Sequence, residues 1–198
     1  MAYKRKDFYH QKAKKEGKAS RAAYKIAQLQ KRLKFIKRGD TVIDLGCSPG
    51  GWLQEMSKLV GSKGNIVGID IEAVRISVPD NVTFILGDIM SPDSIEQLCL
   101  RLTNEPNVIV SDMAPKLSGI TFRDSYKSFE LAQRAFEICQ GILTEGGNFL
   151  VKIFPGKELD DYKKMLKKAF KKVDIIIPPA TRKTSSEMYL VGLGYKKI

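Results

Sequence analysis

The sequence predicts an α/β fold in which helices cover both faces of a mostly parallel seven-stranded sheet whose last strand runs antiparallel. Short runs rich in β-branched, aromatic and other apolar residues indicate the strands; they lie at 41–45, 66–69, 82–86, 107–111, 148–153, 173–177 and 188–193. Amphipathic stretches between these runs indicate the helices; they lie at 51–60, 93–102, 125–143 and 158–171. Strands that alternate with helices are typical of a parallel sheet buried on both faces.

The last two predicted strands differ from the others because no helix separates them. Only residues 178–187 lie between them, and strands joined without a crossover helix pair in the antiparallel direction. This ending is unlike the two equal halves of a dinucleotide-binding dehydrogenase. One more helix is predicted before the first strand, over 20–33, with Ser20 as its N-cap.

The positive charge of the chain is concentrated near its beginning. The chain has 198 residues, which is the length of one domain, and a formal net charge of +12. Residues 1–38 contain 14 of the 34 Lys and Arg residues and two acidic residues, whereas basic and acidic residues balance over 39–198. We therefore expect a single domain, 1–198, made of a basic, partly helical extension and a core. A basic block on a neutral body indicates a nucleic-acid partner, the alternative being a solvated tail.

The cysteine and histidine content excludes several classes of site. Cys47, Cys99 and Cys139 form no C-x-x-C pair, which favours reduced, small packing residues in a cytoplasmic protein over disulfides or zinc. His10 is the only histidine, so a histidine triad or histidine metal cluster within the chain is excluded, and no metal is expected. No apolar run reaches the ~18–20 residues of a membrane span, and we expect no membrane partner.

A glycine-rich loop after the first predicted strand indicates a ligand site. Residues 44–52 (DLGCSPGGW) leave the strand and open a helix, and glycines allow a ligand to approach the backbone. Asp70 and Asp88 end the next two strands, where they can accept hydrogen bonds from ribose hydroxyls and from an adenine amino group. Because Asp44 also stands at a strand end, the loop suits the positive charges of S-adenosylmethionine better than a dinucleotide pyrophosphate, which is the alternative.

Five motifs in order make the chain similar to the FtsJ/RrmJ family of ribose 2′-O-methyltransferases over essentially its whole length. They are residues 20–25 (SRAAYK), 44–52 (DLGCSPGGW), 111–115 (SDMAP), 151–154 (VKIF) and 186–189 (SEMY). The resemblance implies a Rossmann-like class I methyltransferase fold. It implies a catalytic tetrad made of Lys25, Asp112, Lys152 and Glu187. It also implies methyl-donor contacts from Gly50, Trp52, Asp70, Asp88 and Asp112.

The chemistry of the tetrad is consistent with this resemblance. Lys152 lies in the apolar run 149–154, where a charge is costly unless it faces a polar cleft; the alternative is a lysine that reaches solvent from an edge strand. A ribose hydroxyl is a poor nucleophile, and a neighbouring base helps it attack. Our hypothesis is that Lys152 accepts the hydroxyl proton and that Lys25 orients Lys152. Asp112 would fix Lys152 beside the methyl donor, and Glu187 would orient the lysines or the ribose.

The same resemblance implies a substrate. Short bacterial-type members point to a uridine of the 23S large-subunit ribosomal RNA, within the ribosomal subunit, and to a monomer; tRNA is the alternative RNA. Arg182 and Lys183, near Glu187, are further candidates for RNA contacts. A function of another class also stays open, namely an RNA-binding ribosome-assembly factor without activity, although the intact tetrad argues against it.

Overall fold

The structure, a computed structural model, describes residues 8–182 and 184–197, without the side chains of His10 and Lys14. Its helices are α1 (Phe8–Lys15), α2 (Ala22–Leu33), α3 (Gly51–Val60), α4 (Pro92–Leu100), α5 (Thr121–Ile142) and α6 (Leu159–Ala169). Its strands are β1 (Thr41–Leu45), β2 (Asn65–Asp70), β3 (Val82–Leu86), β4 (Val108–Ser111), β5 (Asn148–Ile153), β6 (Phe170–Ile176) and β7 (Met188–Tyr195). Part of the predicted basic extension, residues 1–7, and the predicted RNA contact Lys183 lie outside the described residues.

The seven strands form one sheet in the order β3-β2-β1-β4-β5-β7-β6. β1 to β5 pair in parallel, and β7 is antiparallel to both of its neighbours. The predicted fold is confirmed, with the antiparallel strand last in the chain but inserted between β5 and β6. The burial of the two strands explains this order: Tyr189, Leu190 and Val191 of β7 are fully buried, whereas Lys171 and Lys172 of β6 are exposed, as befits an edge strand.

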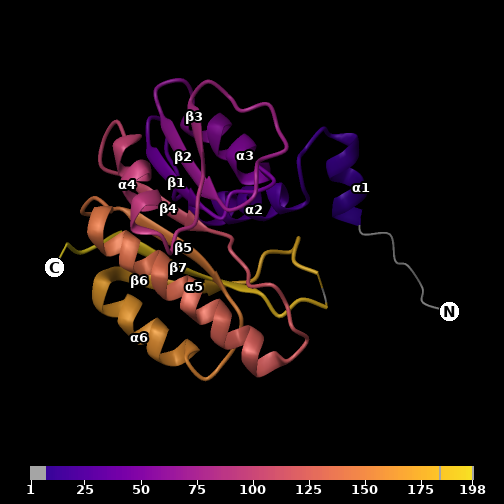
Figure 1. Ribbon diagram of the computed structural model, residues 1–198, viewed down its shortest axis with the longest axis vertical. Helices are drawn as coiled ribbons and strands as arrows, with labels where there is room; N and C mark the ends of the chain where they lie inside the picture. The colour runs from indigo at the N-terminus through magenta and orange to yellow at the C-terminus, as the bar shows by residue number, and fades with distance from the viewer. Residues whose placement is uncertain (1–7, 183, 198) are drawn as a thin grey trace.

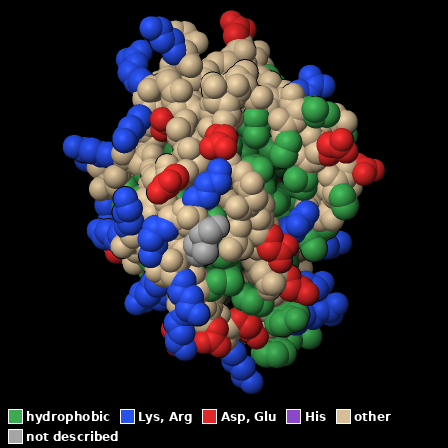
Figure 2. Space-filling view, turned by 90° about the vertical axis from the view of Figure 1, so that its left-hand side faces the viewer, with side chains coloured by type: hydrophobic (Ala, Val, Ile, Leu, Met, Phe, Trp, Pro, Cys, Tyr) green, Lys and Arg blue, Asp and Glu red, His purple; other side chains and the backbone are tan. Residues whose placement is uncertain are grey.

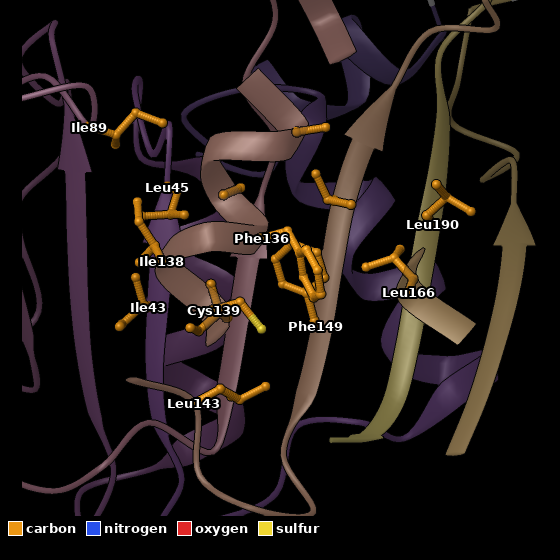
Figure 3. Close-up of a cluster of buried hydrophobic side chains, with 14 of the residues drawn as sticks. Ile43, Leu45, Ile89, Phe136, Ile138, Cys139, Leu143, Phe149, Leu166 and Leu190 are labelled. Carbon is orange, nitrogen blue, oxygen red and sulfur yellow. The ribbon is translucent and has the colours of Figure 1, made fainter. Parts of the chain in front are cut away.

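Helices cover both faces of this sheet (Figure 1). One hydrophobic cluster joins α2 and α3 to the sheet through residues such as Leu29, Trp52 and Leu53. The other joins α4, α5 and α6 to the opposite face, where Phe136 of α5 packs against Phe149 of β5 at a ring-centroid distance of 5.9 Å (Figure 3). Both faces of the parallel strands are therefore buried, as their apolar sequences predict.

Several predicted boundaries and environments differ from the structure. α2 begins at Ala22 with Arg21 as its N-cap rather than Ser20, although Ser20 Oγ still accepts a hydrogen bond from Ala22 N at 3.2 Å. α6 ends at Ala169 because Phe170 turns into the core as the first residue of β6, where it is 1% exposed. Cys47 and Cys139 are buried as expected, but Cys99 is exposed, since the neighbouring Leu98 is the residue of α4 that faces the core.

The surface is not basic throughout. Figure 2 shows the side of the molecule turned away from α1, with Lys and Arg side chains mostly toward one edge, apolar side chains toward the other and acidic side chains among them. Within the N-terminal segment, exposed basic residues lie in the last turn of α2 and in the connection that follows it; they are Lys31, Arg32, Lys34, Lys37 and Arg38. Among the described residues, no helix has the length and apolar character needed to cross a membrane.

Candidate active site

The sheet topology brings three of the predicted catalytic residues to one edge. Asp112 directly follows β4, and Lys152 is the penultimate residue of β5. Because β7 is antiparallel to β5, its amino end meets the carboxyl end of β5, and the register pairs Ile153 with Met188. Glu187, which directly precedes β7, therefore stands beside Lys152. Lys25 reaches the same place from the first turn of α2.

The four residues form two buried ion pairs. Lys25 Nζ lies 2.5 Å from Glu187 Oε1, and these side chains are 6% and 11% exposed. Lys152 Nζ lies 3.0 Å from Asp112 Oδ1 and donates a hydrogen bond to the Asp112 main-chain oxygen at 2.5 Å. The Lys152 and Asp112 side chains are 7% and 16% exposed. The alternative interpretation of Lys152, a lysine that reaches solvent from an edge strand, is therefore wrong. β5 is an internal strand, and Lys152 is buried against Asp112.

Tyr189 joins the two ion pairs and was missed by the sequence analysis. Its hydroxyl donates a 2.6 Å hydrogen bond to Asp112 Oδ1, and Lys25 Nζ lies 5.8 Å from the centre of its ring. The signal was available: residues 187 and 189 are two apart at the start of a strand, so their side chains point to the same face. Burial, then the negative charge and hydrogen bond of Asp112, raise the pKa of Tyr189 well above its ordinary value.

The charge of Asp112 is stabilised by these neighbours. Burial alone would raise the pKa of this carboxyl group. The ammonium groups of Lys152 and Lys25 and the hydroxyl of Tyr189 outweigh that effect, so the pKa lies below its ordinary value. Asp112 is consequently an anion at neutral pH, and it holds the Lys152 amine in a fixed position through two contacts.

An open pocket of about 610 Å³ adjoins the tetrad at the carboxyl ends of the parallel strands, where open α/β sheets bind ligands. Its walls come from the segments 46–49, 69–75, 87–90 and 112–116, together with Leu131. Asp112 therefore belongs both to the tetrad and to the pocket. Asp70 and Asp88, two of the predicted donor contacts, also line it. The carboxylates of Asp70, Glu72, Asp88 and Asp112 outnumber the cations Arg75 and Lys116 in this wall, which suits a positively charged ligand.

The glycine-rich loop forms the pocket wall through backbone conformations that require glycine. Gly46 and Gly50 have φ angles of 82° and 106°, in the region that other residues rarely adopt. A Cβ at Gly46 would overlap the side chain of Met113, which follows the neighbouring strand β4. Asp70 fixes the loop, because its Oδ2 accepts a 2.8 Å hydrogen bond from Ser48 N while its Oδ1 accepts one from Glu72 N. The predicted ligand loop is thus held by one of the predicted ligand acids.

Two predicted donor contacts, Gly50 and Trp52, lie outside the described pocket wall. The Trp52 side chain is 3% exposed; its Nε1 donates a 2.8 Å hydrogen bond to the main-chain oxygen of Ala22, and its ring lies 5.9 Å from that of Tyr189. The indole therefore connects the loop to α2 and to the tetrad. Direct contact of Gly50 or Trp52 with a methyl donor stays a prediction.

Asp44 is a buried acid without compensation. It is fully buried, and neither carboxylate oxygen has a hydrogen-bond partner within residues 8–182 and 184–197. Burial, followed by the charges of Asp112 and Asp70, raises its pKa well above the ordinary value. A bare buried carboxylate is costly, and it sits close enough to two residues of the pocket wall to feel their charge. A cationic ligand in the pocket would offset part of that cost.

Other ligand chemistries find little support in the described residues. Across residues 8–182 and 184–197 no group of three or more His, Cys, Asp and Glu side chains is arranged to hold a metal ion. Burial raises the pKa of the Cys47 thiol in the loop, so this cysteine is poorly suited to nucleophilic attack. Within the described residues, the tetrad and the pocket are thus the candidates for the chemistry of the site.

Comparison with known proteins decides the family. The model of the family described as FtsJ-like methyltransferase matches residues 19–195. The chain belongs to the FtsJ-like methyltransferase family. It is 42% identical over 192 residues to the ribosomal RNA large subunit methyltransferase E of Methanothrix thermoacetophila, covering 97% of this chain and 74% of the relative. It is 41% identical to the protein of the same name from Archaeoglobus fulgidus, with 98% of each chain covered.

A solved structure agrees with this family assignment. A putative ribosomal RNA methyltransferase from Plasmodium falciparum has a TM-score of 0.78 and 28% sequence identity, over 89% of this chain and 98% of that one. A fibrillarin/Nop5p complex also matches, with a TM-score of 0.55 at 17% identity, and so shares only the fold. The FtsJ-like chain is therefore a methyltransferase with a Rossmann-like mixed sheet, as its motifs predict.

Proposed function

We propose that this chain transfers the methyl group of S-adenosylmethionine to the 2′-hydroxyl of a ribose in large-subunit ribosomal RNA, at a uridine. The observation that carries the proposal is the pair of buried ion pairs, Lys25–Glu187 and Lys152–Asp112, beside an acid-lined pocket. Charged groups are rarely buried without a function or a partner, and here both lysines stand where a second substrate meets the pocket. The names of relatives such as that of A. fulgidus support the choice of RNA.

The pocket residues fit S-adenosylmethionine. The pocket has a volume of about 610 Å³, which lies within the range of ordinary ligand pockets. Asp70 would hold the ribose hydroxyls and Asp88 the adenine amino group, as acids at successive strand ends do in nucleotide sites. The uncompensated Asp44 supports a ligand with positive charge. When bound, S-adenosylmethionine supplies a methyl group on a sulfonium sulfur, which leaves as a neutral thioether.

Lys152 would serve as the proton acceptor. The Lys152 ammonium would first release a proton to solvent. The ribose hydroxyl would then attack the methyl carbon in line: the O–C bond forms, the S–C bond breaks with its electron pair on sulfur, and the hydroxyl proton passes to the neutral amine of Lys152. Asp112 holds that amine through the contacts at 3.0 Å and 2.5 Å, which supports a fixed geometry. Glu187 and Lys25, held to each other, would orient the ribose. In this arrangement the chain's residues position the acceptor and take its proton.

The basic N-terminal segment would bind RNA phosphates. Lys18 and Lys25 are committed to internal ion pairs with Glu55 and Glu187. The exposed basic residues at 31–38 lie toward the opposite end of the strands from the tetrad, since Asn148, the first residue of β5, donates a hydrogen bond to Phe35 O. They would therefore contact a part of the RNA backbone remote from the methylated ribose. Such contacts supply affinity that falls with salt and little sequence preference. The segment 8–38 thus acts as an RNA-binding extension of the catalytic core.

Mapping of a radioactive methyl group tests the proposal. The protein is incubated with S-adenosylmethionine labelled in its methyl group and with ribosomal subunits lacking native methylation, free ribosomal RNA or tRNA. A 2′-O-methyl group blocks alkaline cleavage of the adjacent phosphodiester, so the expected label appears in alkali-resistant dinucleotides of large-subunit RNA. Label in mononucleotides would contradict the ribose as acceptor, and label in tRNA alone would contradict the ribosomal substrate.

A matched pair of variants separates an enzyme from a binding factor. Lys152→Ala removes the proposed proton acceptor, and Lys164→Ala removes an exposed lysine of α6 that is paired only with Asp161. The proposal expects label with the wild type and with Lys164→Ala but not with Lys152→Ala. If the wild type bound both RNA and S-adenosylmethionine and no RNA became labelled, the chain would be an RNA-binding assembly factor instead.

A further inference from the structure

The connection between β4 and α5 and the first turn of α5 carry large exposed apolar side chains that the proposed chemistry does not use. Phe122 is 61% exposed, Leu117 66% and Ile120 59%. This connection begins at Asp112, and in Figure 1 it lies on the same side of the molecule as α1 and the connection between β6 and β7 that leads to Glu187. Leu117, Ile120 and Phe122 follow Asp112 by five, eight and ten residues, so an RNA bound at the tetrad would pass near this segment.

Phe122 is held in place by the structure around it. Asp124 fixes the preceding loop, because its carboxylate accepts hydrogen bonds from Ser118 N, Ser118 Oγ and Gly119 N at 2.8, 2.7 and 3.1 Å. In the first turn of α5, Ser125 Oγ donates to the main-chain oxygens of Thr121 and Phe122. An exposed aromatic ring on a rigid support loses little entropy when it binds a partner.

A lysine from the far end of β5 lies over this ring. Lys157 Nζ is 5.5 Å from the centre of the Phe122 ring, and Lys157 is itself exposed. Lys157 follows Lys152 by five residues, in the turn that leaves β5. Gly156 allows this turn to approach α5, since a Cβ there would lie 3.0 Å from Ser125 Cβ. The Phe122–Lys157 pair is thus attached to the same strand end as the proposed proton acceptor.

We infer that Phe122 and Lys157 form a stacking platform for an unpaired base of the RNA, next to the nucleotide whose ribose is methylated. An aromatic ring with one face open binds the π-face of any nucleobase, and a nearby cation adds attraction to the ring and to a phosphate. This combination matches RNA better than an apolar partner, which would have to bury the Lys157 charge. Stacking also holds a target nucleotide out of its helix, which access to its ribose requires.

This inference rests on the proposed function, and the kinetics of methyl transfer to RNA that lacks native methylation give its first test. Phe122→Ala removes the ring, and the expected result is a KM for RNA raised about tenfold, within the usual effect of losing one base–aromatic stack. The dissociation constant for S-adenosylmethionine stays unchanged because Phe122 is outside the pocket wall. Phe122→Trp, which enlarges the ring, retains the wild-type KM. Leu100→Ala is the matched control, since Leu100 is 69% exposed on α4 and faces no proposed substrate.

A fluorescence test does not depend on turnover. Trp52, the single native tryptophan, is buried, so a tryptophan introduced by Phe122→Trp reports on the surface. A short single-stranded RNA of mixed sequence is expected to quench it, and a duplex of the same sequence is not, because only unpaired bases are free to stack. Leu100→Trp supplies the control fluorophore.

The outcomes separate the two proposals. A wild-type KM for Phe122→Ala, or equal quenching of the tryptophans at 122 and 100, would overturn the stacking platform while leaving the methyl transfer intact. A dimer that is lost in Phe122→Ala would also overturn it, in favour of a second copy of the chain as the partner. Quenching at 122 by single-stranded RNA without any methyl transfer by the wild type would instead support the platform and refute the proposed function.

Discussion

The proposed donor pocket and the tetrad lie side by side but are built in opposite ways. The pocket wall consists of short loops at successive strand ends. Two of its acids each accept a hydrogen bond from the backbone N–H two residues further along the chain, Asp70 from Glu72 and Asp88 from Met90. The tetrad consists of side chains from four distant segments, joined by ion pairs. Local backbone geometry thus determines the first, and long-range pairing of buried charges determines the second.

This difference predicts how a substitution affects each half of the site. A change in the pocket wall alters one contact and leaves the remaining loops in position. A change in the tetrad leaves a buried charge without its partner, so its effects spread to stability and to the partner's orientation. Tyr189 and Trp52 link the two halves, and variants that separate binding from turnover test how independent they are.

The largest expected effect follows from Lys152→Ala. Methyl transfer falls by about 10²–10⁴-fold, the usual contribution of a positioned general base. The affinity for S-adenosylmethionine falls much less, because Lys152 is not in the pocket wall and touches it only through its partner Asp112. Single-turnover kinetics and isothermal titration calorimetry measure the two quantities. Near-normal turnover with intact donor binding would refute the role of Lys152, and equal loss of both would mean that the two halves are not separate.

The next effect concerns stability. Lys25→Met leaves Glu187 buried without its cation, and breaking such a pair costs about 3–5 kcal/mol of unfolding free energy. The double variant Lys25→Met/Glu187→Leu recovers most of this loss, since both charges are then gone. Chemical denaturation measures each free energy at constant pH. Lys164→Met, which breaks the exposed pair with Asp161, changes the free energy of unfolding little. An equally small change for Lys25→Met would contradict the importance of the buried pair.

A smaller effect is expected in the donor pocket. Asp70→Asn weakens binding of S-adenosylmethionine by about 10–100-fold, which corresponds to the loss of one hydrogen bond to a charged group. Turnover at saturating donor changes little, because Asp70 touches none of the four tetrad side chains through a hydrogen bond within the described residues. Calorimetry gives the affinity, with Asp80→Asn as an exposed control. A loss of turnover at saturating donor would show that the pocket and tetrad are coupled.

The smallest expected effect is a pH dependence from Asp44. Its pKa is raised in the folded state, so the folded protein binds more protons than the unfolded chain, and stability falls as pH rises above the ordinary aspartate value near 3.8. Asp44→Asn removes this dependence, so its stability relative to the wild type increases with pH. Denaturation from pH 4 upward measures the difference. A saturating cationic donor is expected to reduce the difference in stability between the variant and the wild type. A difference that does not depend on pH would contradict a raised pKa of Asp44.

The sequence predicted those parts of the site that depend on local pattern. The loop 44–52, the acids at the strand ends and the motif residues of the tetrad are visible as residue types at fixed positions along the chain. The spacing of Tyr189 from Glu187 was visible in the sequence, but only the register, which pairs Tyr189 with Lys152 on the neighbouring strand, shows that Tyr189 joins the tetrad. Two predictions at helix ends were wrong. Cys99 was expected to pack but is exposed, and the helix expected to reach residue 171 ends where β6 begins at Phe170. Tertiary packing, not periodicity, decides which face is buried at the end of a helix.

By itself the sequence determined the alternation of strands and helices, the glycine-rich loop and the placement of positive charge, since each follows from composition and spacing within short segments. Only the tertiary structure decided that β7 lies between β5 and β6, which brings Glu187 and Tyr189 to Lys25, Lys152 and Asp112. It also decided that Phe122 and Lys157, distant in sequence, share one surface. The physical reason is that ion pairs and stacked rings form between segments whose approach is fixed by burial of the whole sheet, which no local pattern records.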